Sequence, residues 1–574
     1  MKKVCYMGAV LAMLAAVTGC SSFLDRLPED RIVDQDFWTV PNDVKIYANQ
    51  FYPAFPSHGG YSGGLFWSDN DSDNMTPGTY NQRLAGQNTL NDSGDWSFYN
   101  HIRSVNYGLE RIHTVQGDPN ERDMYVGELL FFRAFFYFQL VRQYGDVPWH
   151  AQSLNIDSEE LFKPRSPRTT VVDSILQDLT TAISYLPVRG SAALNRLNKE
   201  CALLFKSRVA LYEGTWQKYH EGTVFATPGA DWRSYLETAA DAAYTLVELG
   251  TASLFQPVNP ENYYADLFGA KDYATNPEIL LYKKHSEALG QSHFLQRYMF
   301  SGGNTGVSKS LVDDFLCADG LPIANSGLYS GDEKLTDVIA DRDPRLRQML
   351  WAPGDPVEMN NGEITAVFTV PDLAVSGEHR SVSGYQLKKG KTVDMESGSF
   401  DLETASILFR YAEVLLNYAE AKAELGTITQ DDVDLSINKI RLRARMPDLI
   451  IATIAPDPHW LHKDISPLLN EIRRERRIEL ACEGFRFDDL ARWAAMDILV
   501  AKRTLGAKFV QSDFPNLMPG THILINDNGY IDPYQAGLPL GFQFDLERDY
   551  LLPIPQQELT LNKEKLIQNP GWNQ

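Results

Sequence analysis

The sequence has few cysteines, no excess of positive charge and, beyond its first twenty residues, no long apolar run. Cys201, Cys317 and Cys482 lie far apart in the body of the chain, so we expect neither a disulfide framework nor a C-x-x-C metal site. Acidic residues (75) outnumber basic ones (53), and the formal net charge of −22 argues against a nucleic-acid partner. No later stretch approaches the ~18 apolar residues of a membrane helix, which predicts a soluble folded body.

The first twenty residues resemble a bacterial lipoprotein signal. Lys2 and Lys3 precede an apolar run over 4–16, and Val-Thr-Gly-Cys closes it at Cys20. The run is shorter than the ~20 residues that span a bilayer, and small residues precede the cleavage point. We expect removal of residues 1–19, acylation of Cys20 as a stable membrane anchor, and a polar tether over 20–31. A secreted protein without a lipid is the alternative.

The body of the chain, residues 32–574, is predicted to be mainly α-helical. A chain of 574 residues is longer than the ~250 to 300 at which one core stops growing, so more than one packed unit is expected. Apolar periodicity and Gly or Pro stops predict helices over 43–52, 96–115, 121–144, 170–186, 199–214, 231–249, 403–425, 430–445 and 466–483. Helix pairs of about 34 residues favour a tetratricopeptide-like scaffold, although the repeat consensus is incomplete.

The predicted helices form two groups, at about 96–250 and about 403–495, and the helical signal disappears between these groups. Over about 251–402, Gly, Pro and short β-like runs take its place. A stretch of this length without regular structure is unusual in a compact domain unless it forms a functional surface or a small subdomain. We therefore expect a large irregular ligand-binding region of loops and short strands, carried on the rigid helical-pair scaffold.

A highly charged helix is predicted near the end of the chain, within 471–493. Glu471, Glu475 and Glu479 alternate with four arginines, so that neighbours three and four positions apart have opposite charge: Arg473, Arg474, Arg476 and Arg477. Such a helix is either solvated or buried with every guanidinium paired. The interleaved glutamates do not suit a basic nucleic-acid patch.

This charged segment resembles the signature of the SusD/RagB family of surface glycan-binding lipoproteins of nutrient-uptake systems. Further similar segments follow in family order at 132–134, 144–148, 276–279, 342–346, 411–421 and in the C-terminal motif at 550–572. The resemblance implies a binder with neither enzymatic activity nor a cofactor. It also implies lipid anchoring at the outer membrane, exposure at the cell surface, and delivery of a glycan to a SusC-like TonB-dependent transporter.

A glycan site needs aromatic planes for the C–H faces of sugar rings and polar side chains for their hydroxyls. Material of this kind occurs at Tyr61, Trp67, Tyr80, Arg83, Trp96, Asn100, Tyr298, Phe300, Asn304 and Tyr329. Trp67 and Tyr298 are favoured because they lie in Gly-rich stretches that we expect to be exposed loops. Trp96 opens a predicted helix and is equally well explained as a core residue.

Other motifs carry less weight. The G-x-S-x-G match at 60–64 lies between a proline and a polar loop, not between the strand and helix that expose a nucleophilic serine. Residues 69–73 resemble the start of a calcium loop but lack its later Gly and Glu. His285 and His293 lack the H-E-x-x-H spacing of zinc proteases. We assign no catalytic or metal-binding residue. Capture of peptides by the same architecture, and a surface glycoside hydrolase, are the alternatives.

Overall fold

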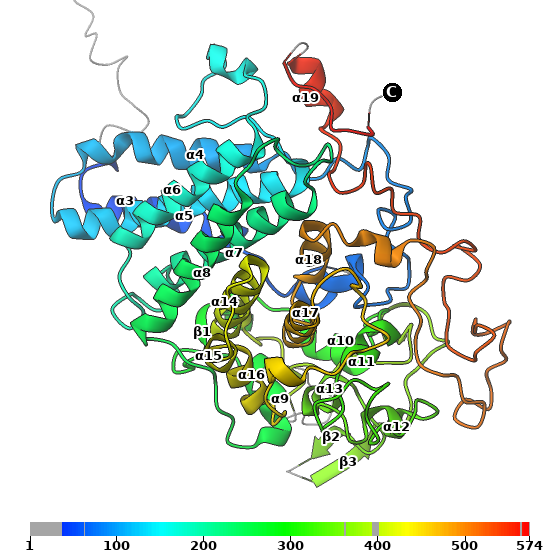
Figure 1. Cartoon of the computed structure of the whole chain (residues 1–574). Helices are drawn as coiled ribbons and strands as arrows, with labels where there is room; N and C mark the ends of the chain where they lie inside the picture. The colour runs from blue at the N-terminus through cyan, green and yellow to red at the C-terminus, as the bar shows by residue number, and fades with distance from the viewer. Residues whose placement is uncertain (1–36, 62, 361–362, 393–400, 563–564, 573–574) are drawn as a thin grey trace, which may run out of the picture.

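The computed structural model describes residues 37–61, 63–360, 363–392, 401–562 and 565–572. The predicted signal peptide, lipidation site and tether lie outside these ranges and stay predictions. Figure 1 shows a mainly helical molecule in which long helices form one side and short helices, loops and two small sheets form the other. This arrangement confirms the predicted fold class.

The helical scaffold consists of seven helices that pack in succession. Their bounds are α3 (Pro41–Asn49), α4 (Phe98–Arg111), α5 (Pro119–Tyr144), α6 (Arg168–Tyr185), α7 (Lys199–Tyr219), α8 (Trp232–Leu249) and α14 (Tyr411–Leu425). From α4 to α8 each helix packs against the next, and α14 then packs against α8. α14 therefore closes the stack, although more than 150 residues separate it from α8 in the sequence.

Side-chain caps set the starts of α5 and α7 within two residues of the predicted positions. The Asp118 carboxylate accepts a hydrogen bond from Asn120 N–H at the start of α5, and Asn198 caps α7 in the same way. The predicted end of α7 at Gly214 is wrong, because the helix continues to Tyr219. A Cβ at Gly214 would lie 2.8 Å from Leu236, so this glycine permits close packing of α7 on α8.

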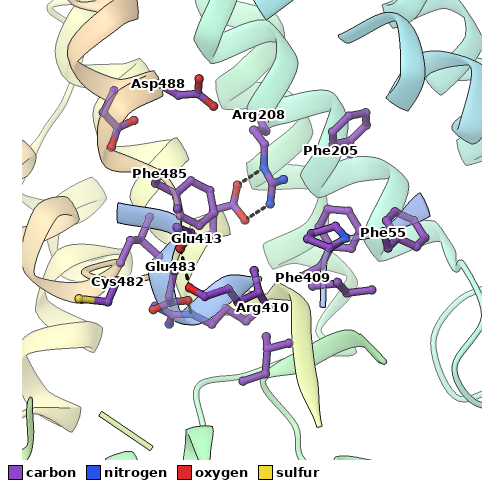
Figure 2. Close-up of a pocket in the computed structure, with 18 of the residues that line it drawn as sticks. Phe55, Phe205, Arg208, Phe409, Arg410, Glu413, Cys482, Glu483, Phe485 and Asp488 are labelled. Atoms are coloured by element: carbon purple, nitrogen blue, oxygen red, sulfur yellow. Dashed lines mark hydrogen bonds and ion pairs between the residues drawn. The ribbon is translucent and has the colours of Figure 1, made fainter. Parts of the chain in front are cut away.

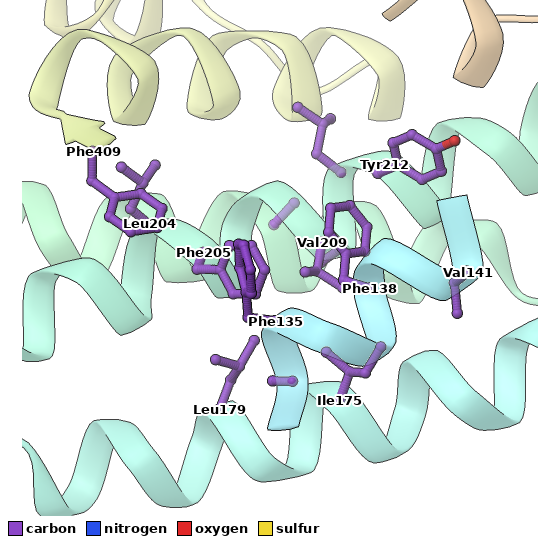
Figure 3. Packing of buried hydrophobic residues seen from close by; sticks show 14 of the residues in the cluster. Phe135, Phe138, Val141, Ile175, Leu179, Leu204, Phe205, Val209, Tyr212 and Phe409 are labelled. Carbon is purple, nitrogen blue, oxygen red and sulfur yellow. The ribbon is translucent and has the colours of Figure 1, made fainter. Parts of the chain in front are cut away.

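The scaffold core is built from aromatic and branched side chains. Phe135 and Phe138 of α5 face Phe205 of α7, with ring centroids 5.9 and 5.6 Å apart, and Figure 3 shows α6 approaching from the other side. Phe409, which lies just before α14, also contacts the Phe205 ring, at 6.2 Å. α5 is buried on several sides, as its nearly continuous apolar sequence predicted.

The region 251–402 contains more helix than the sequence predicted. It folds into α9 (Tyr263–Phe268), α10 (Leu295–Ser301), α11 (Lys309–Asp314), α12 (Leu335–Ile339), α13 (Pro344–Met349), β1 (Ile279–Lys283), β2 (Pro356–Asn360) and β3 (Glu363–Val367). β2 and β3 form an antiparallel pair, with Pro356 opposite Val367. Helices of five to seven residues are too short to show a clear apolar period, which explains why the sequence did not reveal them.

β1 connects this region to the scaffold by pairing with β4 (Ser406–Arg410) in an antiparallel manner, with Ile279 opposite Arg410. The predicted helix over 403–425 is therefore wrong in its first part, because β4 precedes α14. Strand pairing with β1 outweighs the helical periodicity that Leu408 seemed to extend. The pairing of β1 with β4 thus joins two segments that are distant in sequence.

The remaining helices are α15 (Gln430–Leu435), α16 (Ile437–Arg443), α17 (Pro467–Glu479), α18 (Arg486–Arg492) and α19 (Gln556–Leu561). The single helix predicted over 430–445 is interrupted at Ser436, whose φ of −119° and ψ of −83° are not helical. α17 packs against α14 and α11 and lies at the centre of the molecule in Figure 1.

α17 is a buried charged helix. All four of its arginines are at most 5% exposed. Arg473 contacts Glu424 at 2.9 Å, Arg476 contacts Asp489 at 2.9 Å, and Arg477 contacts Asp73 at 2.9 Å. The solvated interpretation is therefore wrong, and burial with paired guanidinium groups is the one that holds.

Glu479 is the centre of this charged cluster, which we call the ionic core. Its carboxylate accepts hydrogen bonds from Arg345 at 3.2 Å, from Arg410 at 2.7 Å, and from Arg443. Burial alone would raise the pKa of Glu479, but Arg443, Arg410 and Arg345 hold it well below its usual range. The ionic core comprises Glu420, Glu475, Glu479, Arg345, Arg410, Arg443, Arg492 and the four arginines of α17.

Candidate functional site

Five aromatic side chains, two of them exposed, gather in one cluster that we call the aromatic patch: Tyr61, Phe66, Trp67, Phe294 and Tyr298. The Trp67 and Tyr298 rings lie 4.6 Å apart, and Tyr61 lies 6.0 Å from Trp67 and 6.2 Å from Tyr298. Tyr61 is 46% exposed and Phe294 is 44% exposed. Two residues favoured by the sequence analysis thus come together with two exposed rings beside them.

The patch is held by a short helical turn and a glycine. Trp67 lies in the 3₁₀ helix η3 (Leu65–Asp71), and its indole N–H donates a hydrogen bond of 2.9 Å to the Gly303 carbonyl. Gly303 has a φ of +65°, and a Cβ there would lie 2.5 Å from the Phe66 ring. Glycine is thus required at 303 for η3 to pack against the end of α10.

Polar side chains surround the patch. Arg297 of α10 forms an ion pair with Glu378, which lies in the 3₁₀ helix η8 (Gly377–His379). The Arg380 guanidinium donates a hydrogen bond of 3.1 Å to the Asn304 side chain. Asn304, which the sequence analysis proposed as a companion of the aromatic residues, directly follows Gly303, whose carbonyl accepts the Trp67 hydrogen bond, and its role in binding stays a prediction. Guanidinium, amide and carboxylate groups next to exposed rings match the chemistry that binds sugar hydroxyls.

Trp67 and Tyr298 differ from the expectation in one respect, because they are not exposed loop residues. Trp67 is 9% exposed and Tyr298 is 3% exposed, and each lies in a short helix. Burial raises the pKa of Tyr298, and the nearby Glu378 carboxylate raises it further. Their rings support Tyr61 and Phe294, which present the exposed faces.

Tyr80 and Arg83 pack against the C-terminal part of the chain. The Tyr80 ring packs on Tyr534 at 5.8 Å. Arg83 donates hydrogen bonds to the backbone carbonyls of Asp549 and Tyr550, at 2.7 and 2.9 Å, and thereby ties the C-terminal segment to the loop before α4. These contacts are structural, because both side chains are half-buried against the C-terminal segment.

Trp96 packs between Tyr99 and Tyr144, at 5.0 and 4.9 Å, which supports the interpretation of Trp96 as a packing residue. Asn100 is exposed on α4. Tyr329 lies beneath the Arg342 guanidinium at 5.5 Å.

Phe300 is half-buried in α10, and its backbone carbonyl accepts a hydrogen bond of 2.7 Å from Gln386.

The sequence analysis missed Phe294. It lies four positions before Tyr298, one helical turn away, and their rings are 6.5 Å apart. This spacing is a helical signal, but it was not used because the whole stretch was expected to be irregular.

The acidic stretch at 69–73 has a structural role. Asp69 accepts hydrogen bonds from the backbone N–H groups of Cys482 and Gly484, at 2.8 and 2.9 Å. Asp73 accepts from Arg477 and Arg486, each at 2.9 Å. These carboxylates fasten η3 to α17 and to the turn that follows it.

A cavity of about 430 Å³ lies behind the patch. It is bounded by α5 and α7 on one side and by the turn between α17 and α18 on the other, with β4 along its base. Figure 2 shows Arg208 and Glu413 pointing toward one another in this cavity, joined by two hydrogen bonds of 2.6 Å. Phe66 of the patch also lines the cavity and packs on Trp67, at 4.7 Å, so it lies between the cavity and Trp67.

Comparison with known proteins places the fold. Residues 272–572 match the sequence model of the SusD family, which is more than half of the chain. The chain belongs to the SusD family. Residues 23–211 match a second SusD-like model, described as starch-binding and associating with the outer membrane. The resemblance stated from the sequence motifs is thereby confirmed.

Individual relatives agree with this assignment. SusD-like protein P2 of Formosa agariphila is 25% identical over 100% of both chains. SusD-like protein P38 of the same organism is 30% identical over 35% of this chain, which spans 41% of the length of that relative. A solved SusD-like protein of Bacteroides fragilis has a TM-score of 0.69 and 25% identity, covering 95% of this chain and 100% of its own. A second one, described as a SusD-like carbohydrate binding protein, has the same fold, with a TM-score of 0.69, 22% identity and coverage of 92% and 99%.

Proposed function

We propose that this member of the SusD family is a non-catalytic glycan receptor. In this proposal it is anchored to the outer membrane through Cys20, exposed at the cell surface, and delivers oligo- or polysaccharide to a SusC-like TonB-dependent transporter. The observation that carries the proposal is the aromatic patch with its polar surround. One of the matched family models is described as starch-binding and associating with the outer membrane, and this description also supports the proposal.

The patch has the two components that saccharide recognition requires. The exposed faces of Tyr61 and Phe294 offer apolar planes to the C–H faces of sugar rings, and Trp67 and Tyr298 hold them in position. Arg297, Glu378 and Arg380 offer donors and acceptors at the edge. Because the rings are fixed by packing, little side-chain entropy is lost when a glycan binds.

Binding is tested with the chain that lacks residues 1–20, by affinity electrophoresis and calorimetry against a panel of polysaccharides and a panel of peptides. Tyr61→Ala removes an exposed face of the patch and is expected to weaken glycan binding at least about tenfold, which corresponds to ~1.4 kcal/mol. Tyr185→Ala is the matched control, because Tyr185 is 39% exposed on α6 and lies outside the patch. If the protein binds peptides but no glycan, and Tyr61→Ala abolishes the peptide binding, then the cargo in this proposal is a peptide and not a glycan.

Turnover and anchoring need separate measurements. Prolonged incubation of the protein with any bound polysaccharide is expected to release no reducing sugar, and release would favour the glycoside hydrolase alternative. Replacing Cys20 with Ala is expected to move the protein from the membrane fraction to the soluble fraction. Retention of the Cys20→Ala variant in the membrane would contradict lipid anchoring.

A further inference from the structure

The cavity behind the patch has an apolar wall in which phenylalanine is the most frequent residue, and six of these rings carry the argument. These rings come from the loop before η3, from α5 and α7, from β4 and from the turn before α18: Phe55, Phe135, Phe138, Phe205, Phe409 and Phe485. The volume of about 430 Å³ lies within the ~300 to 1,000 Å³ of ordinary small-molecule sites. The lining thus has the aromatic character of a ligand site and enough space for one or two six-membered rings.

The charged groups of the cavity are paired with one another. Arg208 donates two hydrogen bonds of 2.6 Å to Glu413, and its guanidinium lies over the rings of Phe409 and Phe485 at 5.0 and 5.1 Å. Arg410 contacts Glu483 at 2.7 Å. The remaining basic residues of the lining are paired as well: Arg142 with Asp488, Lys389 with Glu483, Arg476 with Asp489 and Arg492 with Glu420.

This pairing restricts the chemistry of an occupant. A charged ligand would compete for a guanidinium or carboxylate that already has a partner, and one charge would be left buried and unpaired. A neutral hydroxyl has no such cost, because it donates to a free lone pair of a carboxylate and accepts from a free guanidinium N–H. Apolar ring faces and paired polar groups together favour a neutral ring that carries several hydroxyl groups.

Solvent reaches the cavity. The side chains of Arg142 and Asp488 are 27% and 26% exposed, and that of Arg208 is 22% exposed. Pro56 and Gly484, which also line it, are exposed. Solvent therefore reaches the cavity at residues that lie outside the aromatic patch.

We propose that this cavity is a second binding site, which takes a neutral sugar of one or two rings. It extends the proposed function, because the patch contacts a glycan at the surface whereas the cavity encloses a free sugar or a chain end. The two sites share a wall: Leu295 and Met299 of α10 line the cavity, and Tyr298 of the same helix belongs to the patch. Tyr61 belongs to the patch and does not line the cavity, whereas Leu408 lines the cavity, so a substitution of either residue addresses one site.

The test uses the chain without residues 1–20 and saturation-transfer NMR with eight neutral mono- and disaccharides. Leu408→Trp fills the cavity, since Leu408 of β4 lines it and is half-buried. Leu540→Trp is the matched control, because Leu540 is 74% exposed and lies away from the cavity lining. We expect at least one sugar to bind, with its Kd raised at least about tenfold by Leu408→Trp and unchanged by Leu540→Trp and Tyr61→Ala.

Two results would overturn the cavity proposal. One is the absence of binding by all eight sugars, and the other is binding that Tyr61→Ala abolishes and Leu408→Trp leaves intact. Because the second result still supports a receptor at the patch, failure of the cavity and failure of the proposed function are distinguishable. Circular dichroism checks that Leu408→Trp folds. If it does not, a crystal of the unaltered protein soaked with the tightest-binding sugar decides between density in the cavity and density at the patch alone.

Discussion

The scaffold core and the ionic core are both buried, yet they are stabilised by opposite kinds of contact. Between α5, α6 and α7 most contacts are apolar, as among Phe135, Phe205 and Ile175, and the ion pairs Arg133–Asp178 and Arg168–Glu213 lie beside them. Around α17 they are ion pairs, such as those of Glu479 with Arg410 and Arg443. Apolar contacts are numerous and individually weak, whereas each buried charge depends on a few partners.

This difference predicts how each region tolerates change. Shortening a side chain in the scaffold core leaves a small void and a graded loss of stability. Removing one charge from the ionic core leaves several opposite charges without compensation in a place that water does not reach. The ionic core also connects segments distant in sequence, since Arg345 lies in α13 and Glu475 lies in α17. We therefore expect it to determine how the region 251–402 sits on the scaffold.

Glu479→Gln gives the largest expected effect. The change preserves the shape of the side chain but leaves Arg345, Arg410 and Arg443 short of one negative charge, so we expect a loss of about 3–5 kcal/mol in the free energy of unfolding. Urea denaturation followed by circular dichroism measures it. Glu261→Gln is the control, because Glu261 is paired with Arg445 at an exposed position and should change stability by less than about 1 kcal/mol. Equal effects in the two variants would contradict the comparison.

Acid should affect the two regions in different pH ranges. Burial lowers the pKa of His220, at the end of α7, to about 4, although the Ala491 carbonyl opposes the shift. The unfolded state therefore binds the proton from about pH 6.5 downward, and stability falls as the pH drops from about 6.5 to 4, by up to about 3 kcal/mol. Burial would raise the pKa of Glu420, but Arg492 and Arg476 lower it to about 2, so the contribution of Glu420 is lost only below about pH 4.5.

Urea denaturation at several pH values between about 7 and 3 separates these ranges. His220→Gln is expected to flatten the dependence between about pH 6.5 and 4 and to leave the fall at lower pH intact. Gln retains an N–H group that can donate to the Ala491 carbonyl, which limits other effects of the change. An unchanged slope in His220→Gln would show that His220 does not determine the upper range.

Ile175→Val tests the scaffold core with a change of one methylene group. Ile175 is fully buried on α6, where Figure 3 shows it facing the α5 side chains, and we expect a loss of about 0.5–1.5 kcal/mol. The same urea measurement applies. A loss as large as that of Glu479→Gln would mean that the apolar core is as intolerant as the ionic core.

Much of the scaffold could be predicted from the sequence, because long helices show their apolar period and the Gly or Pro residues that end them. α5 and α8 lie within two residues of their predicted bounds. The region 251–402 could not be predicted in this way. Its helices have five to seven residues, and the pairing of β1 with β4 joins segments more than 120 residues apart. Contacts at that sequence distance leave no local period.

The candidate site was predicted only in part, because it too depends on contacts between segments that are distant in sequence. Aromatic residues in Gly-rich stretches directed attention to Trp67 and Tyr298, and the fold brings them together. Their burial could not be predicted, since it depends on η3 packing against the end of α10. Tyr80 and Trp96 are aromatic as well, but these two residues and Arg83 are used in packing against the C-terminal segment and α5.

Tyr61→Ala should have the smallest effect on stability. Tyr61 is 46% exposed, so its truncation is expected to change the free energy of unfolding by no more than about 0.5 kcal/mol, while glycan binding weakens. Tyr298→Ala is the contrasting variant within the same patch, because Tyr298 is 3% exposed and its loss should cost about 3 kcal/mol or more. Thermal unfolding and affinity electrophoresis on both variants separate binding from support. A loss of stability in Tyr61→Ala that equals the loss in Tyr298→Ala would show that Tyr61 belongs to the core and that Phe294 alone presents a free face.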